Sequence, residues 1–218
     1  MSHPPRVVPC HSNVKPMETK GKLSAPSAER NQAAILEVLA QYAPATGTAL
    51  EIASGTGQHS VAFAKQHPNI QWQPTDIIEE RLTSIAVWRA EHALGNLRPP
   101  VRFDAILDPV PETQIDVVIT INLLHLIGED ECWTILRKVA GALAPNGYFL
   151  FYGPFRRDTG FASEDDRDFH HKLQAMDPSI GYKEVRDMKN WIRTHGLTLV
   201  KIHDMPSNNL MWVVQKSG

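Results

Sequence analysis

A loop of small residues and an acidic residue downstream of it are the parts of this sequence best suited to hold a ligand. The segment from Leu50 to His59, LEIASGTGQH, joins an apolar run to a helical pattern. Small residues let the backbone approach a ligand closely, and the helix that follows offers unpaired N–H groups. Asp76 ends the next apolar run, where a carboxylate can accept hydrogen bonds from both hydroxyls of a ribose. The pattern therefore predicts a nucleotide-like ligand at a strand–helix turn.

Apolar runs that alternate with helical patterns must position these residues. Strands are predicted at residues 49–53, 70–75, 101–103, 115–121, 148–152, 197–203 and 210–215. Helices are predicted from residue 27 onward and at 59–66, 78–94, 129–143, 164–176 and 183–194. Because strands and helices alternate with short connections, the fold class is α/β: a doubly wound, mostly parallel seven-stranded sheet. The last two runs predict a hairpin, so the C-terminal strand is antiparallel.

Composition excludes several classes of protein. The chain has 218 residues and a formal net charge of −2, which predicts one domain and argues against nucleic-acid binding through bulk charge. No apolar run is long enough to span a bilayer, and prolines interrupt the start of the chain where a signal peptide needs an apolar helix. Two cysteines, Cys10 and Cys132, match no zinc or disulfide framework. We expect a cytoplasmic protein without a membrane partner; its oligomeric state is open.

Two segments depart from the alternating pattern of strands and helices. Residues 1–26 contain five prolines and predict a tail or flap ahead of a single domain at residues 27–218. Within that domain, residues 153–181 are polar and charged and interrupt the alternation of strands and helices. Their charges are mixed in sign, which disfavours a phosphate-binding track and is typical of a solvated surface or of a lid over a ligand.

The order of the motifs resembles the class I S-adenosylmethionine (SAM)-dependent methyltransferases, whose fold is the one predicted above. In that family the first strand ends in an acid and a Gly-x-Gly-x-Gly loop follows. Here Glu51 matches the acid, and Ala53, Gly55 and Gly57 match the glycines, so alanine replaces the first glycine. The resemblance implies a SAM site. It assigns to cofactor binding Glu51, Ala53, Gly55, Gly57, Asp76, Ile77, Asp104, Ala105, Asn122 and Leu123.

Segments outside this core are similar to a narrower family, methyltransferase-like 26. They are residues 27–31 (SAERN), 152–155 (YGPF) and 208–210 (NNL). From them we add Arg30 and Asn31 to the cofactor site, since arginine binds carboxylates such as that of methionine; a surface arginine balancing an acid is the alternative. Tyr152, Gly153, Phe155, Asn208 and Asn209 are predicted to bind the methyl acceptor. The alternatives are a rigid turn with the phenylalanine packed inward and asparagines that only form the hairpin turn.

Histidines supply the remaining candidates for chemistry. His125 follows the fourth strand and is the predicted general base, with packing at a helix start as the alternative. His59 could contact the cofactor carboxylate or face solvent. His170 and His171 are accompanied by no cysteine or acid at metal-ligand spacing, so we predict no metal site.

These observations predict a SAM-dependent methyltransferase that releases S-adenosylhomocysteine (SAH). The acceptor is unknown, and a small molecule or a protein is favoured over nucleic acid. A non-catalytic SAM-binding interaction protein is the alternative, because no base is obvious in the sequence. A nicotinamide-dependent oxidoreductase is less favoured, since its Gly-x-Gly-x-x-Gly fingerprint needs glycine where this chain has Ser60.

Overall fold

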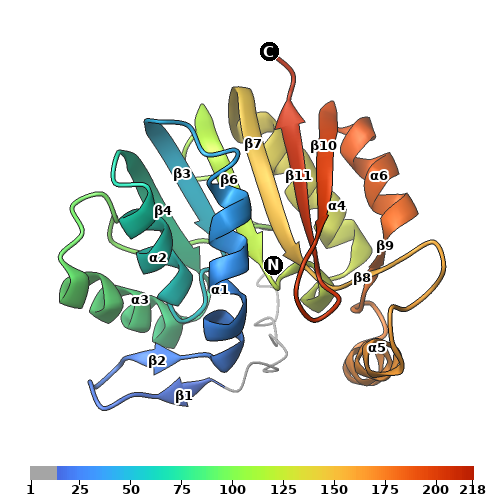
Figure 1. Cartoon of the computed structure of the whole chain (residues 1–218), viewed down its shortest axis with the longest axis horizontal. Coiled ribbons are helices and arrows are strands. Elements are labelled where there is room, and N and C mark those ends of the chain that lie inside the picture. Colours follow the sequence, from blue (N-terminus) through green and yellow to red (C-terminus); the bar gives the residue numbers. More distant parts are fainter. Residues whose placement is uncertain (1–13) are drawn as a thin grey trace.

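A seven-stranded sheet runs through the centre of the molecule (Figure 1). The computed structural model describes residues 14–218. The strand order is β10-β11-β7-β6-β3-β4-β5, and β11 is antiparallel to both of its neighbours while the other pairings are parallel. The strands are β3 (Gly47–Ile52), β4 (Ile70–Asp76), β5 (Val101–Arg102), β6 (Ile115–Ile121), β7 (Leu143–Gly153), β10 (Leu197–Asp204) and β11 (Leu210–Lys216). The predicted fold class, including the antiparallel C-terminal strand, is confirmed.

Helices cover both faces of the sheet, as a doubly wound fold requires. Figure 1 shows α1 and α2 on the near side of the sheet and α4 behind it. The near-side group is α1 (Pro26–Leu39), α2 (Gln58–Gln66) and α3 (Glu79–His92). The opposite group is α4 (Glu129–Ala142) and α6 (Val185–Thr194). No helix in residues 14–218 is long and apolar enough to cross a membrane.

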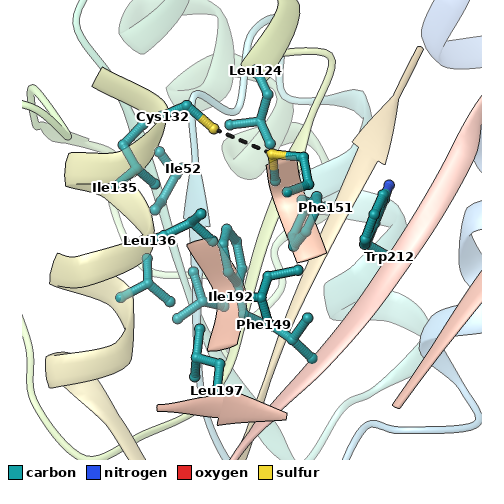
Figure 2. Close-up of a cluster of buried hydrophobic side chains, with 14 of the residues drawn as sticks. Ile52, Leu124, Cys132, Ile135, Leu136, Phe149, Phe151, Ile192, Leu197 and Trp212 are labelled. Atoms are coloured by element: carbon teal, nitrogen blue, oxygen red, sulfur yellow. Dashed lines mark hydrogen bonds between the residues drawn. The ribbon is translucent and has the colours of Figure 1, made fainter. Parts of the chain in front are cut away.

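Each face of the sheet buries its own apolar layer. Figure 2 shows one layer, in which Phe149, Phe151 and Trp212 from the sheet meet Leu136 of α4 and Ile192 of α6. The other layer lies against the near-side helices and is built from side chains that include Ile35, Phe63, Trp72 and Val117. Successive residues of a strand point to opposite faces, which is why the central strand β6 is apolar almost throughout.

Residues 14–25 form structure that the sequence did not predict. The short strands β1 (Lys15–Pro16) and β2 (Leu23–Ser24) pair as an antiparallel hairpin. The buried Lys22 places its ammonium 3.7 Å from the ring centroid of Trp88 on α3 and forms an ion pair with Glu91. Helix α1 then begins at Pro26, one residue before its predicted start, and Ala25 is its N-cap. The part of the predicted tail or flap at residues 1–13 lies outside the described residues.

The polar excursion at residues 153–181 contains one helix, α5 (Glu164–Met176), at the predicted position. Its N-cap is Ser163, whose hydroxyl accepts a hydrogen bond from the Asp166 N–H (3.2 Å). Two short strands, β8 (Phe155–Arg156) and β9 (Lys183–Glu184), pair in parallel at the two ends of the excursion. Helix α5 consequently lies beside the edge of the sheet where the parallel strands end, apart from the sheet itself (Figure 1).

Candidate functional site

Two cavities adjoin at the carboxyl ends of β3, β4 and β6, the edge where open α/β sheets bind ligands. The larger cavity has a volume of about 390 Å³ and the smaller one about 50 Å³. Both are lined by Ala53, Arg81 and Leu123, so one elongated ligand can occupy both. The smaller cavity is mostly apolar and is further lined by Ile52, Ile77, Phe103, Asp104, Ala105 and Ile106.

The loop after β3 is held by glycine-type backbone conformations. Gly55 has φ +61° and Gly57 has φ +94°, and Ala53 adopts φ +57° although it carries a Cβ. A Cβ added to Gly57 would lie 2.9 Å from the Cα of Ile85, so glycine is needed for α2 to pack against α3. A Cβ added to Gly55 would meet no atom within 4 Å, and Gly55 lines the larger cavity. The loop therefore leaves open space on its cavity side.

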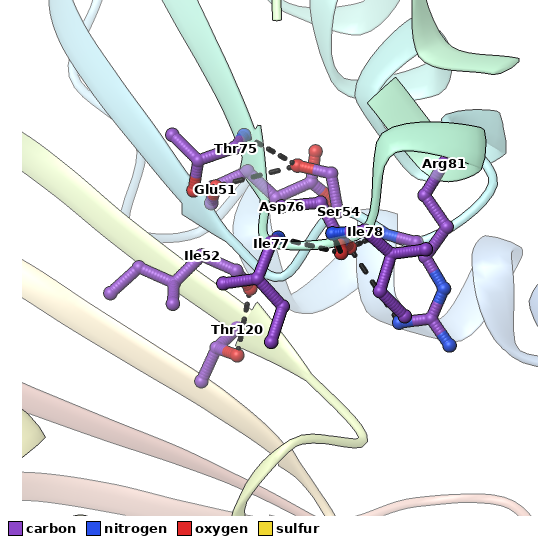
Figure 3. Close-up of polar contacts among 10 residues, drawn as sticks. Glu51, Ile52, Ser54, Thr75, Asp76, Ile77, Ile78, Arg81 and Thr120 are labelled. Carbon is purple, nitrogen blue, oxygen red and sulfur yellow. Dashed lines mark hydrogen bonds and ion pairs between the residues drawn. The ribbon is translucent and has the colours of Figure 1, made fainter. Parts of the chain in front are cut away.

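Asp76 fastens this loop to the start of α3 (Figure 3). One carboxylate oxygen accepts hydrogen bonds from the N–H groups of Ile77 (2.8 Å) and Ile78 (3.1 Å). The other accepts from the Gly55 N–H (2.9 Å) and lies 3.7 Å from the Arg81 guanidinium. A carboxylate offers about four lone-pair sites, so one of them remains for a ligand hydroxyl. Asp76 lines the smaller cavity, as a ribose ligand would need.

Asp104 follows β5 much as Asp76 ends β4, and it too accepts hydrogen bonds from the backbone of the next turn. Its Oδ1 accepts hydrogen bonds from the N–H groups of Ile106 (2.8 Å) and Leu107 (3.2 Å), which fixes the turn that bounds the smaller cavity. The predicted pair Asp104 and Ala105 therefore lines the smaller cavity, as does Ala53 of the loop after β3.

Glu51 is a buried carboxyl group at the base of the larger cavity. Burial raises the pKa of Glu51 from about 4.5 to about 7, although the Ser60 hydroxyl, which donates a hydrogen bond to Oε2, opposes this shift. The same contact explains why serine stands where a dinucleotide fingerprint has its third glycine. Near neutral pH, Glu51 is consequently divided between its charged and uncharged forms.

This raised pKa predicts a loss of stability as the pH rises. The unfolded chain releases the Glu51 proton from about pH 4.5, whereas the folded protein holds it to about pH 7. The free energy of unfolding should therefore fall by about 2 kcal/mol between pH 5 and pH 7 through this group alone. In Glu51→Gln that part of the fall is expected to vanish, and in the exposed control Glu80→Gln it should persist. Urea unfolding at both pH values measures it; equal falls in parent and Glu51→Gln would contradict the assignment.

Tyr152 connects three of the predicted segments. Its hydroxyl hydrogen-bonds with the side chains of Asn31 and Asn209, and burial raises its pKa. The Oδ1 of Asn31 in turn accepts a hydrogen bond from the Nε2–H of His59 (2.9 Å). Burial lowers the pKa of His59 to about 4, so this histidine is neutral. Arg30, from the same helix as Asn31, is exposed at the rim of the larger cavity.

His125 is buried and lines the larger cavity. Its ring centroid lies 5.9 Å from that of Phe169 and 6.3 Å from that of Tyr182. The predicted Asn122 and Leu123 line the same cavity, and the Asn122 N–H donates to the carbonyl of Tyr152 (2.8 Å). The end of β6 therefore presents an amide and an imidazole to the same space.

Several predicted contacts differ in the structure. Phe155 lines neither cavity: its ring packs 5.3 Å from that of Trp212, because the residue enters β8 facing the core. This corrects its assignment to the acceptor site. Asn208 is exposed and donates to Asp166 on α5 (3.0 Å), while its neighbour Asn209 does line the larger cavity. Gly153 lines neither cavity, and a Cβ added to it would lie 3.6 Å from the Nδ1 of His125.

Sequence reasoning missed other residues of the larger cavity. Asp166 and Phe169 come from the excursion, Tyr182 directly follows it, and all three line the cavity together with His125. The polar character of residues 153–181 signalled a lid but did not single these side chains out. His170 accepts a hydrogen bond from the Tyr182 N–H (3.0 Å), and residues 14–218 contain no group of three or more potential metal ligands.

The hairpin of residues 14–25 also borders this site. The Leu23 N–H donates to the Ser84 hydroxyl (2.9 Å), and that hydroxyl donates to the carbonyl of Thr56 in the loop after β3 (2.8 Å). The Ala25 N–H donates to the Oε1 of Gln58, the first residue of α2 (2.6 Å). Hairpin and loop are therefore tied through shared hydrogen bonds.

Comparison with known families covers nearly all of the described chain. A family model described as a protein of unknown function, DUF938, matches residues 22–216. The chain belongs to the DUF938 family. The finer resemblance to the methyltransferase-like 26 family stays a prediction.

Several solved structures similar to this DUF938 protein are described as methyltransferases. A putative O-methyltransferase from Nostoc punctiforme superimposes with a TM-score of 0.76 at 19% identity, over 87% of this chain and 56% of that one. An O-methyltransferase family 2 protein from Planctomyces limnophilus, in complex with apigenin, gives 0.75 at 17%, over 87% and 57%. CalO1, a methyltransferase of calicheamicin biosynthesis in its SAH-bound form, gives 0.69 at 20%, over 85% and 54%. This DUF938 protein spans little more than half their length, and the likeness establishes the Rossmann-like methyltransferase fold.

Proposed function

We propose that this protein is a SAM-dependent methyltransferase acting on a small molecule or on an exposed group of a protein. The observation that carries the proposal is the pair of joined cavities at the carboxyl edge of the sheet, one small and mostly apolar and one larger and of mixed polarity. SAM has the same division: an apolar adenine ring, a ribose and a charged methionine end.

The residues present fit that cofactor. Ile77 and Ala105 would flank the adenine in the smaller cavity, with Asp104 beside its amino group. The remaining lone pair of Asp76 would take a ribose hydroxyl. The open space at Gly55 would admit the methionine end, because no protein atom lies within 4 Å of a Cβ placed there. Arg30 at the rim is suited to the methionine carboxylate.

When bound, SAM supplies a methyl group on a sulfonium, which is already a good leaving group. The protein's own part is then to orient the acceptor and exclude water. His125 is the side chain placed to take a proton from the acceptor, since it lines the larger cavity next to the residues that follow β6. Cavities of about 300–1,000 Å³ are typical of small-molecule sites, and the larger cavity falls in that range.

Calorimetric titration with SAH tests the proposal, with NAD as control and with mass spectrometry to detect co-purified ligand. We expect micromolar binding of SAH and no binding of NAD. Binding of NAD alone would favour an oxidoreductase. Binding of SAH without turnover on any acceptor would favour the non-catalytic interaction protein. Binding of neither by folded, ligand-free protein would contradict the proposal.

Asp76→Ala is expected to weaken SAH binding by about 1–3 kcal/mol, or roughly fivefold to 150-fold, because the ribose loses its acceptor and the Gly55 N–H loses its hydrogen-bond partner. The exposed Glu80→Gln, on the first turn of α3 shortly after Asp76, is the matched control and should bind SAH as the parent does. Asp76→Asn keeps an oxygen for the N–H groups of α3 and serves if the alanine variant unfolds. Parental affinity in a folded Asp76→Ala protein would show that the ribose assignment is wrong.

A further inference from the structure

The side of the larger cavity that faces away from the loop after β3 is built largely from aromatic rings. We call it the acceptor wall and define it as His125, Asp166, Phe169 and Tyr182. The ring centroids of Phe169 and Tyr182 lie 6.2 Å apart at 68°, and each also contacts His125 edge to face. The wall therefore carries one carboxylate among three rings.

The carboxylate of Asp166 is held only by neutral donors. Its Oδ1 accepts from the Tyr182 hydroxyl (3.0 Å), and its Oδ2 accepts from the Ser163 hydroxyl (2.8 Å) and the Asn208 amide (3.0 Å). These bonds orient the group without neutralising it. Within residues 14–218, none of the ion pairs includes Asp166. Because Asp166 is half-buried, its charge is only partly screened by water.

The arginines of the excursion form ion pairs with other residues, and the buried Lys183, which follows Tyr182, donates to the carbonyls of Ile127 (2.5 Å) and Gly181 (3.0 Å). Arg156 pairs with Glu184 (3.2 Å) and Arg157 with Asp204 (3.2 Å). Arg167, the residue after Asp166, pairs with Glu164 on the same helix (2.8 Å).

The other ionisable groups of the cavity do not offset this charge at the wall. The two arginines that line it, Arg30 and Arg81, come from α1 and α3 on the opposite side, and Arg81 lies 3.7 Å from Asp76. Burial and the neighbouring Asp166 raise the pKa of Tyr182, so its hydroxyl stays protonated and donates to the carboxylate. His59 is neutral and Glu51 contributes at most further negative charge. With His125 in the neutral form that its proposed role as a base requires, the acceptor wall is net negative in the part of the chain that the structure describes.

We propose that the acceptor wall binds a cationic group, an ammonium carried on a small apolar body, with Asp166 as its charge partner and the rings of Phe169 and Tyr182 as its aromatic contacts. Cations are attracted both to aromatic faces and to a partly buried carboxylate. An anionic acceptor would meet repulsion at the same place. The inference rests on the proposed function, which assigns the other side of the cavity to SAM.

Three probes with one phenyl body separate charge from shape: 2-phenylethylamine, which is cationic, 3-phenylpropanamide, which is neutral, and 3-phenylpropanoate, which is anionic. Each is titrated calorimetrically at pH 7 into SAH-saturated protein and, in parallel, into ligand-free protein. We expect the cation to bind at least tenfold more tightly than the amide, and the anion more weakly than the amide. A cation that binds no better than the amide, or a set of three probes that all fail to bind, overturns the inference.

Two variants assign the preference to one carboxylate. Asp166→Asn is expected to abolish the preference for the cation. Asp168→Asn removes the same charge from an exposed site on the same helix and should leave the preference intact. Tyr182→Phe keeps both the ring and the charge, so it should retain a preference even if Asp166→Asn unfolds. A preference that survives in folded Asp166→Asn, or that is lost in Asp168→Asn, overturns the inference. SAH binding without a cation preference defeats this inference alone, whereas absent SAH binding defeats the proposed function.

Discussion

Gly57→Ala is expected to destabilise the protein by about 3 kcal/mol. The left-handed conformation at φ +94° costs a residue with a Cβ about 1–2 kcal/mol, and overpacking against Ile85 adds a similar amount. The clash is with a backbone atom, the Cα of Ile85 at 2.9 Å, so no change of rotamer relieves it. Urea unfolding measures the loss, and a Gly57→Ala protein as stable as the parent would show that α2 and α3 do not pack this closely.

Gly55→Ala is the matched control two residues away. Its conformation at φ +61° costs about 1 kcal/mol, but the added methyl meets no protein atom. Stability should therefore fall little. The methyl would instead stand in the space assigned to the cofactor, and SAH affinity should fall at least tenfold. An alanine at position 55 that leaves SAH affinity unchanged would place the cofactor elsewhere.

His125→Asn is expected to lower turnover at least a hundredfold while SAH affinity changes less than twofold. Removal of a general base typically costs a factor of about 10²–10⁴, and the cofactor contacts are assigned to residues other than His125. The measurement is the rate of SAH release in a single turnover. The acceptor is chosen among amines that bind to the acceptor wall. His171→Asn, at an exposed histidine on α5, is the control. Undiminished turnover in His125→Asn would leave this side chain with a packing role only.

The parts of the fold that the sequence predicted are those whose signal is local. The apolar run at residues 115–121 is long and β-branched, which is why β6 appears within its predicted bounds. The loop from Ala53 to Gly57 was recognisable because its small residues stand in register with Asp76 and Asp104 further along the chain. Asp76 was recognisable by its place at the end of a strand, although its three backbone hydrogen bonds were not.

The parts that escaped prediction depend on contacts between distant segments. Asp166 and Tyr182 are joined by a hydrogen bond between segments 16 residues apart, and no pattern in the sequence predicts such a contact. The acceptor wall could therefore be recognised only from the structure. Phe155 was misassigned because a residue just past a strand end can face either the ligand or the core, and Trp212, far along the chain, decides between them. The hairpin at residues 15–24 consists of two-residue strands, too short for an alternating pattern to register.

The hydrogen bonds that tie the hairpin to the loop have a thermodynamic consequence. The Ser84 hydroxyl joins Leu23 to Thr56, so a hairpin in place favours one geometry of the loop. Linkage between two such equilibria is reciprocal: the free energy by which an ordered hairpin strengthens ligand binding equals the free energy by which a bound ligand holds the hairpin closed. The N-terminal segment thereby shares in the affinity of a site to which its own side chains contribute little, and a ligand in that site protects the segment from local unfolding in return.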